Sequence, residues 1–156
     1  MSVFNPPRLA HVLLCALLGA TAALPAAARD AGFVSISGNT VNVRTQPTTR
    51  SETAWELGKG YPLKVEQRRG QWLKVRDHEE SLGWVFAPLT DKTPHRVVTA
   101  PTANLRAGPS PRHRVIGKLE QHEVMRTVGS QGDWAQVKRE SGQRGWGAKR
   151  LTWGWE

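Results

Sequence analysis

One tryptophan and one arginine are each repeated in this chain at the same separation. Both side-chain types commonly bind ligands. Trp72 is followed by Trp134, and Arg44 by Arg106, in both cases 62 residues later. An indole ring offers a flat apolar surface with one N–H donor, and a guanidinium can hold a carboxylate through two parallel hydrogen bonds. These residues indicate ligand binding, with the aromatic rings supplying contact area.

Each of these residues could instead have a structural role, and the sequence does not decide between the two. Trp72 and Trp134 each begin a predicted strand just after a Gly turn, on the face opposite its apolar residues, so each could lie across the end of a barrel. Because tryptophan is seldom wholly buried, the two roles are compatible. Arg44 and Arg106 precede a long polar loop, and we favour a role in holding the loop backbone. Tyr61, which follows a Gly-Lys-Gly turn, completes the candidate ligand-binding set.

The chain carries no catalytic motif that we recognise. Its one cysteine, Cys15, lies in an N-terminal apolar run that we expect to be removed, which leaves no thiol nucleophile. The later histidines, His78, His95, His113 and His122, show no metal-ligand spacing along the sequence. Neither G-x-S-x-G nor H-E-x-x-H is present. We therefore expect a protein that is not an enzyme and that uses no metal or other cofactor.

The N-terminal segment has the features of a secretory signal peptide. Arg8 supplies a positive charge, Leu9–Leu24 is mainly apolar, and small alanines follow. We predict a signal peptide that forms a helix over residues 1–28, with cleavage between Ala28 and Arg29. An uncleaved anchor is the less favoured alternative, because the apolar run is near or below the ~18 residues of a membrane-spanning helix. The predicted location is periplasmic or secreted, with no stable transmembrane anchor.

Positive charge is concentrated in the second half of the chain. The whole sequence has 22 Lys and Arg against 13 Asp and Glu, a net charge of +9. Residues 29–91 carry 9 basic and 8 acidic residues, whereas residues 92–156 carry 12 and 5. A basic excess raises the local concentration of anionic partners. We expect the second half to be drawn to lipid head groups, wall polymers or wall-peptide carboxylates, and we expect no nucleic acid partner for an exported protein.

An internal duplication positions all of these residues. The offset of 62 residues relates further pairs, with no gap: Gly70 and Gly132, Val75 and Val137, Gly83 and Gly145, Trp84 and Trp146, and Leu89 and Leu151. A repeat at a fixed register indicates two copies of one structural unit. We predict domains at residues 31–90 and 95–153, joined by a short linker.

Each copy is predicted to consist of short β-strands. Leu63–Glu66 and Trp72–Arg76 alternate apolar and polar residues, and Gly, Pro and polar turns separate the runs. No segment after the N-terminal run shows a sustained helical period. This pattern predicts an all-β chain with one small barrel or sandwich in each copy. A unit of about 60 residues buries only about 60% of its unfolded surface, so packing between the copies would stabilise both.

The remaining tryptophans divide into two groups. Trp84 and Trp146 occur in both copies, and we assign them to the cores as structural residues. Trp55, Trp153 and Trp155 occur in one copy only, so they serve that copy, the contact between copies, or a partner. We expect the tail that contains Trp153 and Trp155 to pack back onto the barrels, and stacking on sugar rings is the less favoured role.

Five motifs in the second copy resemble the bacterial SH3 (SH3b) domain: N-L-R-A-G-P-S, V-I-G-K-L, G-D-W-A-Q-V-K, G-Q-R-G-W and a closing Leu. The first copy is more divergent, with N-V-R-T-Q-P-T, L-G-K-G-Y-P-L, G-Q-W-L-K-V-R and L-G-W-V. It has Gln46 where the second copy has Gly108, and Trp55 where the second copy has Gly117. The resemblance implies two SH3-like, partly open barrels of five to six strands. It also makes Trp72 and Trp134 similar to the peptide-gripping tryptophan of eukaryotic SH3 domains.

The resemblance implies a role in binding wall components or wall-associated proteins. We therefore expect a non-catalytic exported binding module that recognises peptidoglycan or other cell-envelope material, as wall peptide or glycan. The alternative is a periplasmic scaffold or regulator that binds only protein partners.

Overall fold

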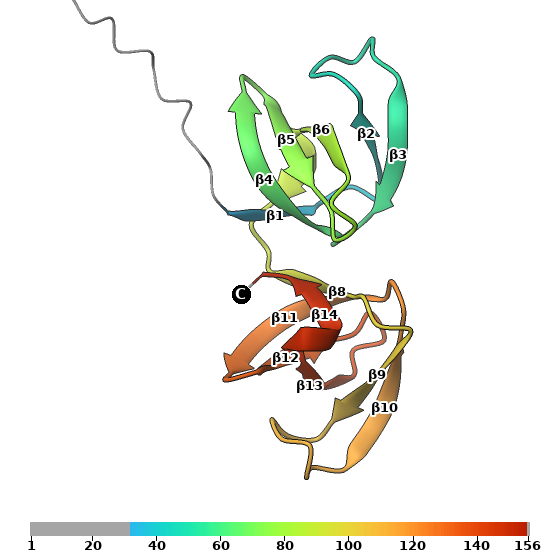
Figure 1. Cartoon of the computed structure of the whole chain (residues 1–156), viewed down its shortest axis with the longest axis vertical. Helices are drawn as coiled ribbons and strands as arrows, with labels where there is room; N and C mark the ends of the chain where they lie inside the picture. Colours follow the sequence, from blue (N-terminus) through green and yellow to red (C-terminus); the bar gives the residue numbers. More distant parts are fainter. Residues whose placement is uncertain (1–31, 156) are drawn as a thin grey trace, which may run out of the picture.

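The computed structural model describes residues 32–155, which form two all-β domains stacked end to end (Figure 1). The first domain contains β1 (Phe33–Ile36), β2 (Thr40–Arg44), β3 (Thr53–Gly58), β4 (Pro62–Arg69), β5 (Trp72–Arg76), β6 (Leu82–Phe86), the 3-10 helix η1 (Ala87–Leu89) and β7 (Thr90–Asp91). The second contains β8 (His95–Val98), β9 (Thr102–Arg106), β10 (Val115–Glu120), β11 (Val124–Gln131), β12 (Trp134–Lys138), β13 (Arg144–Ala148), η2 (Lys149–Leu151) and β14 (Thr152–Gly154). The predicted signal peptide over 1–28, with its cleavage site at Ala28 and Arg29, lies outside the described residues.

The two domains have the same topology, which confirms the duplication and the all-β fold. The strand order is β3-β2-β6-β5-β4-β1-β7 in one sheet and β10-β9-β13-β12-β11-β8-β14 in the other, and every pairing is antiparallel. The short strands β7 and β14 pair with β1 and β8 and bring each described sheet to seven strands, more than the five or six expected. Within residues 32–155, no helix is long and apolar enough to span a membrane.

Each domain has its own hydrophobic core, built from the inward faces of these strands. In the first domain, Val43, Leu63 and Val75 are fully enclosed. In the second, Leu105 and Leu119 are equally enclosed. Burying an aliphatic side chain of this size stabilises a fold by roughly 1.5–3 kcal/mol. Because the cores are separate, each domain positions its own outer face without help from the other core.

Trp84 and Trp146, both assigned to the cores from the sequence, differ in burial: Trp84 is 8% exposed and belongs to the buried apolar residues, whereas Trp146 is half-buried. Gly83 and Gly145, just before them, pair with the core residues Val75 and Val137 and so occupy core-facing positions. A Cβ on Gly83 would lie 2.4 Å from Val43 Cγ1, and one on Gly145 would lie 2.6 Å from Leu105 Cγ. Neighbouring side chains therefore fill the core at these positions. Since successive residues of a strand point to opposite faces, both tryptophans lie on the outer face.

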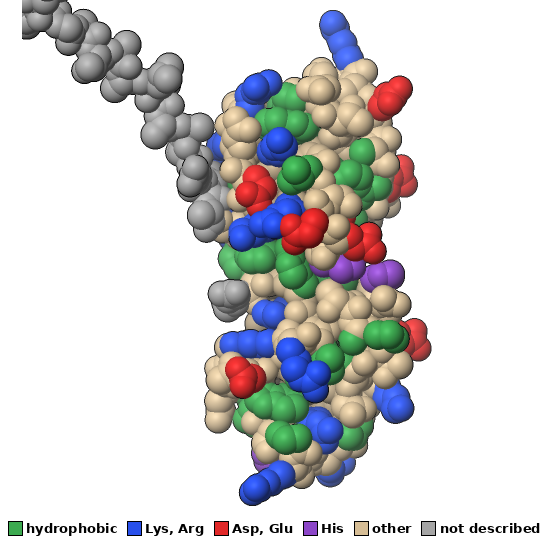
Figure 2. Space-filling view, in the orientation of Figure 1, with side chains coloured by type: hydrophobic (Ala, Val, Ile, Leu, Met, Phe, Trp, Pro, Cys, Tyr) green, Lys and Arg blue, Asp and Glu red, His purple; other side chains and the backbone are tan. Residues whose placement is uncertain are grey.

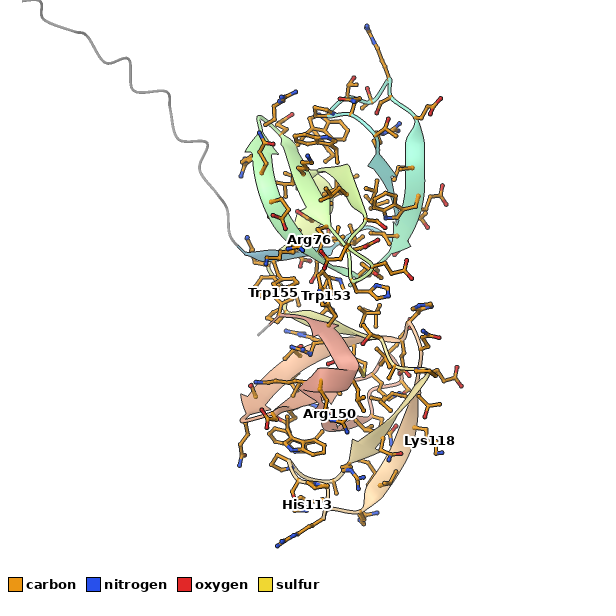
Figure 3. The ribbon with its side chains drawn as sticks, viewed as in Figure 1. Arg76, His113, Lys118, Arg150, Trp153 and Trp155 are labelled. Atoms are coloured by element: carbon orange, nitrogen blue, oxygen red, sulfur yellow. The ribbon has the colours of Figure 1, made fainter. Side chains whose placement is uncertain are left out.

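The C-terminal tail joins the two domains, as expected for Trp153 and Trp155. Both rings pack against Phe33 of β1, with ring centres 5.0 Å and 6.2 Å away, and Trp155 Nε1 donates a hydrogen bond to Ser35 Oγ at 3.1 Å. Figure 3 shows the two labelled tryptophans at this joint. Arg96 is buried beside them, and its guanidinium donates to the Trp155 carbonyl and to Thr152 Oγ1. The tail therefore forms part of the contact between the domains.

The linker between the domains is short and fixed by hydrogen bonds. Only three residues separate β7 from β8. The carbonyl of Thr93 accepts hydrogen bonds from Ser35 Oγ at 2.7 Å and from His95 Nδ1 at 2.9 Å. On the other side of the joint, a Cβ on Gly60 would lie 3.0–3.2 Å from atoms of His95 and Val124. Backbone and side chains of both domains thus meet closely along the joint.

Candidate functional site

The outer face of the second domain brings together the predicted binding residues of that copy. Antiparallel register pairs Trp134 with Ala148, and Trp146 with Arg106. Residues that are directly opposite in an antiparallel pair share one face of the sheet. Trp134, Arg106 and Trp146 therefore lie on the same face, on neighbouring strands β12, β9 and β13. Trp134 and Trp146 are both half-buried.

A groove of about 350 Å³ lies on this face. It is lined by Asn104, Arg106, Pro111, Asp133, Trp134, Ala148, Lys149, Arg150 and Leu151. Three of the lining side chains are cationic, and one, Asp133, is acidic. The groove thus combines an aromatic ring with an excess of positive charge. Figure 3 shows Arg150, in η2, projecting from the middle of this domain.

The first domain has the matching tryptophans, Trp72 and Trp84, and the matching Arg44, but other side chains surround them. Trp72 packs against Phe86, with ring centres 5.4 Å apart. The Arg69 guanidinium lies 5.6 Å from the centre of the Trp84 ring, and Trp84 is only 8% exposed. The duplication places Ala148 of the second domain at the position of Phe86. A methyl group thus takes the place of a phenyl ring beside Trp134, where Ala148 lines the groove.

Arg44 and Arg106 make the same loop contact in both domains. Arg44 Nη1 donates to the Ser51 carbonyl at 2.7 Å, and Arg106 Nη1 donates to the His113 carbonyl at 2.9 Å. These bonds hold the loop that follows β2 or β9, which is the structural role favoured from the sequence. Arg106 also lines the groove, so its loop contact fixes one wall of that groove.

The loops differ at the position where Gln46 replaces Gly108. A Cβ on Gly108 would lie 2.5 Å from the His113 ring, so that ring occupies the space of a side chain at position 108. In the first domain, the residue matching His113 is the smaller Ser51, whose Oγ donates to the Gln46 carbonyl at 3.0 Å. The divergence noted in the sequence is therefore a paired exchange that keeps both loops compact.

Tyr61 lies away from the groove, at the joint between the domains. Its hydroxyl is 2.5 Å from His78 Nδ1. Burial raises the pKa of Tyr61 well above its ordinary value, and the carboxylates of Asp77 and Glu79 raise it further. The phenol therefore stays protonated at neutral pH. In this structure Tyr61 orients His78 and lies in a different part of the molecule from Trp72 and Trp134.

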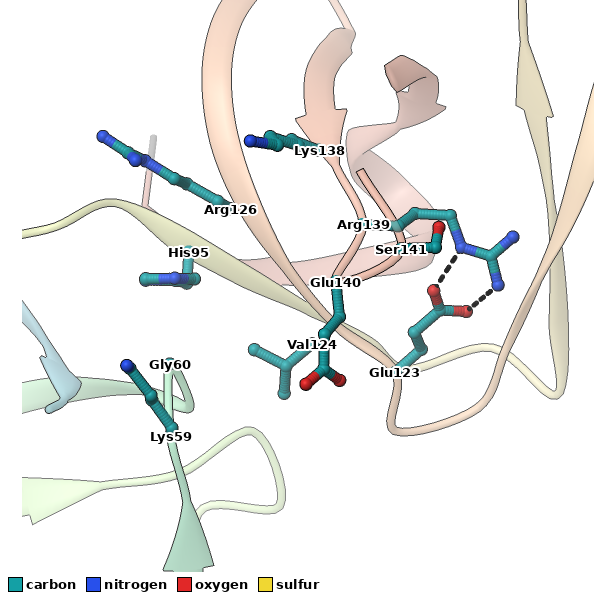
Figure 4. Close-up of a pocket in the computed structure, with 10 residues that line it drawn as sticks. All are labelled: Lys59, Gly60, His95, Glu123, Val124, Arg126, Lys138, Arg139, Glu140 and Ser141. Carbon is teal, nitrogen blue, oxygen red and sulfur yellow. Dashed lines mark hydrogen bonds and ion pairs between the residues drawn. The ribbon is translucent and has the colours of Figure 1, made fainter. Parts of the chain in front are cut away.

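A second hollow, of about 720 Å³, opens between the domains (Figure 4). Lys59 reaches it from the first domain, while Arg126 and Lys138 reach it from the second. Arg139 donates two hydrogen bonds to Glu123 on the opposite side, at 2.6 Å and 3.1 Å. The hollow is therefore mainly cationic. The sequence signalled only the basic character of the second copy, because this hollow exists only when the two domains are in contact.

His95 forms part of the same hollow. Burial lowers the pKa of His95, the hydrogen bond to Thr93 and the charge of Asp91 oppose this, and the nearby charges of Arg126 and Lys59 add to it. The neutral imidazole is therefore favoured within the joint.

A family model described as "Bacterial SH3 domain" matches residues 37–92, and a second model with the same description matches residues 101–152. None of the curated proteins matches the chain.

Similar solved structures include an NlpC2 protein from Trichomonas vaginalis, at 11% identity and a TM-score of 0.37, with 80% of this chain and 48% of that chain covered. An NlpC/P60 family protein from Bacillus cereus ATCC 10987 is 16% identical, with a TM-score of 0.38, and the match covers 78% of this chain and 56% of that one. The chain thus spans about half the length of the structures that it matches.

Proposed function

The chain belongs to the bacterial SH3 domain family, with two such domains in tandem, and from this we propose that it is a non-catalytic exported protein that binds cell-envelope material. The proposed ligand is peptidoglycan, bound through its peptide. The binding site is the groove of the second domain. The first domain contributes chiefly the joint that supports the second.

The groove beside Trp134 is the observation that carries this proposal. An indole ring supplies apolar contact area for a peptide backbone or a short side chain. Arg150 and Lys149 place positive charge along the same groove, where a peptide carboxylate would be attracted. Wall peptides carry free carboxylates, so their chemistry is complementary to this lining.

The charge distribution supports the same ligand class. Figure 2 shows Lys and Arg side chains spread over the visible face of the second domain, with few acidic side chains among them. Residues 92–156 carry 12 basic and 5 acidic residues. Such a field accelerates encounter with an anionic polymer and weakens as salt screens it. Electrostatic attraction would bring the protein to the wall, and the groove would select the peptide that is bound.

A sedimentation assay with purified sacculi tests this function. The wild-type protein is expected to pellet with sacculi at low salt. Trp134→Ala should weaken binding by about 2 kcal/mol, or roughly thirtyfold, because an aromatic anchor is lost. Trp72→Ala is the matched control, since it removes the equivalent ring from the first domain, where Phe86 packs against it, and it should bind as the wild type does.

Two results would contradict the proposal. One is a protein that stays in the supernatant at low salt, which would favour the alternative of an envelope scaffold that binds only proteins. The other is equal binding by Trp134→Ala and the wild type, provided that circular dichroism shows both to be folded. Binding that is lost at high salt but not in Trp134→Ala would show that charge, and not contact with the ring, holds the protein on the wall.

A further inference from the structure

Three side chains with metal-binding atoms meet where the two domains touch. His78 and Glu79 lie in the turn between β5 and β6, and His122 lies in the turn between β10 and β11 of the other domain. One ligand atom from each of the three lies within 4.8 Å of the others. The two imidazole ring centres are 5.6 Å apart. Figure 2 shows histidine side chains at this boundary, beside acidic side chains of the first domain.

The hydrogen bond with Tyr61 leaves one specific nitrogen of His78 available. Nδ1 of His78 lies 2.5 Å from the Tyr61 hydroxyl, while Nε2 lies 3.9 Å from a carboxylate oxygen of Glu79. A histidine that binds a metal through one nitrogen typically uses the other to hydrogen-bond to an oxygen, which fixes the ring and its tautomer. Tyr61 stands in the place of that supporting oxygen.

Both turns are held in shape before any ion arrives. Asp77 Oδ1 accepts hydrogen bonds from the backbone N–H of Glu79 and of Ser81, each at 2.9 Å. On the other side, the backbone N–H of His122 donates to the Val98 carbonyl at 2.8 Å, and His122 has a φ of +66°. The backbones that carry the three donors are thus fixed, and only side-chain rotation is needed to close the site.

We propose that His78, Glu79 and His122 bind one divalent transition-metal ion across the joint between the domains. Two imidazoles and one carboxylate are ligands that suit Zn²⁺, Ni²⁺ and Cu²⁺ better than Mg²⁺ or Ca²⁺, which prefer oxygen. In a tetrahedral zinc site with bonds of about 2.0–2.1 Å, ligand atoms stand about 3.3 Å apart. The present spread of up to 4.8 Å closes by small rotations of Glu79 and His122, both of which are exposed.

The local charge favours a cation at this point of a basic protein. The turn from Asp77 to Glu80 contains three carboxylates, of which Glu80 is paired with Arg76. An ion held here would be liganded by both domains at once, so it would act as a clasp between them. This proposal does not depend on wall binding, because the groove beside Trp134 is formed by other residues.

Isothermal titration of the tag-free protein with zinc chloride tests the site. We expect one zinc ion per chain, with no comparable heat from magnesium or calcium. His122→Asn and Glu79→Gln should each weaken zinc binding by at least about tenfold. Asparagine is chosen because it tolerates the positive φ at this position. His113→Asn is the matched control, because that exposed histidine lies at the far end of the second domain (Figure 3), and it should bind as the wild type does.

Sedimentation velocity with and without zinc provides the second measurement. A site within one chain predicts that the zinc-bound protein remains a monomer, with unchanged stoichiometry at different protein concentrations. Zinc-dependent dimers would overturn the proposal, because they would mean that the histidines bridge separate molecules. Wild-type affinity in His122→Asn would overturn it as well.

Discussion

One residue exchange, Phe86 in the first domain for Ala148 in the second, distinguishes the surroundings of Trp72 from those of Trp134. Phe86 packs against Trp72, with the ring centres 5.4 Å apart. Ala148 lines the open space beside Trp134. The two tryptophans occupy equivalent positions in the duplication, yet they differ in the surface that they offer to a ligand. One side chain therefore changes the surroundings of two equivalent tryptophans.

Ala148→Phe is expected to close the groove and abolish wall binding. The phenyl ring should pack on Trp134 as Phe86 packs on Trp72, so the unfolding free energy should stay within about 1 kcal/mol of the wild type, since the outer face already accommodates this arrangement in the first domain. Sacculi sedimentation measures binding, and urea unfolding measures stability. A folded Ala148→Phe variant that still binds sacculi fully would place the binding site elsewhere.

At the scale of elements, the strands could be predicted because apolar and polar residues alternate along them. Trp72–Arg76 has the bounds that its alternation predicts. The predicted strand at Leu63–Glu66 extends in the structure to Arg69, because the register shifts between Val65 and Gln67 and pairing then resumes. A bulge breaks the period of two, so alternation alone could not reveal the last part of this strand.

The outer position of Trp84 and Trp146 could not be read from the sequence. Their strands contain glycines where a core residue would be expected, and a large apolar residue next to a small one invites assignment to the core. The reason for each glycine is a side chain from another strand, Val43 or Leu105, that already occupies the space. That information lies in tertiary contacts, which a strand pattern does not contain.

The tail strand β14 depends on a glycine for its place against the first domain. Gly154 has a φ of +138°, and a Cβ there would lie 2.4 Å from the His95 carbonyl oxygen and 3.2 Å from Pro62 Cγ. Gly154→Ala is therefore expected to push the tail away from Phe33 and to destabilise the protein by about 1–3 kcal/mol. Urea unfolding followed by tryptophan fluorescence measures the effect.

Gly142→Ala is the control for backbone strain alone. Gly142 also has a positive φ, of +90°, but a Cβ at that position would meet nothing within 4 Å. Equal losses in the two variants would show that the close approach at Gly154 contributes nothing beyond its backbone conformation.

At the scale of the whole molecule, the joint makes stability depend on pH through His95. Burial holds the pKa of His95 below its ordinary value of about 6.5. Above that value the imidazole is neutral in the folded and the unfolded chain. Below it the unfolded chain takes up a proton first, so the unfolding free energy falls as the pH decreases toward the lower folded pKa.

Urea unfolding at about pH 7.5 and about pH 5.5 measures this dependence. The wild type should lose more stability on acidification than His95→Gln, while the other histidines contribute equally to both. The charges that face His95 are Asp91, Arg126 and Lys59, and all three are unchanged in the variant. The same loss in both proteins would show that His95 is not the group responsible.

The sequence predicted both domains but none of the sites between them. His78 and His122, or Lys59 and Arg126, are far apart along the chain and belong to different copies. Spacing rules for metal ligands apply within one element or loop, and charge counts apply to one segment at a time. Only the packing of one domain on the other brings these groups together. The sequence predicted that the tail packs back onto the barrels, but it did not indicate which groups of the two domains would meet there.

The bond from Trp155 to Ser35 joins residues that are 120 positions apart. Closing a loop of that length costs more chain entropy than closing the short hairpins inside each domain. The additional free energy is about (3/2)RT multiplied by the natural logarithm of the ratio of the two loop lengths. Each barrel can therefore form before the joint does. During synthesis, the Phe33 ring is not covered by Trp153 and Trp155 until these two residues have emerged. Until then, this aromatic side chain is open to contact with another chain.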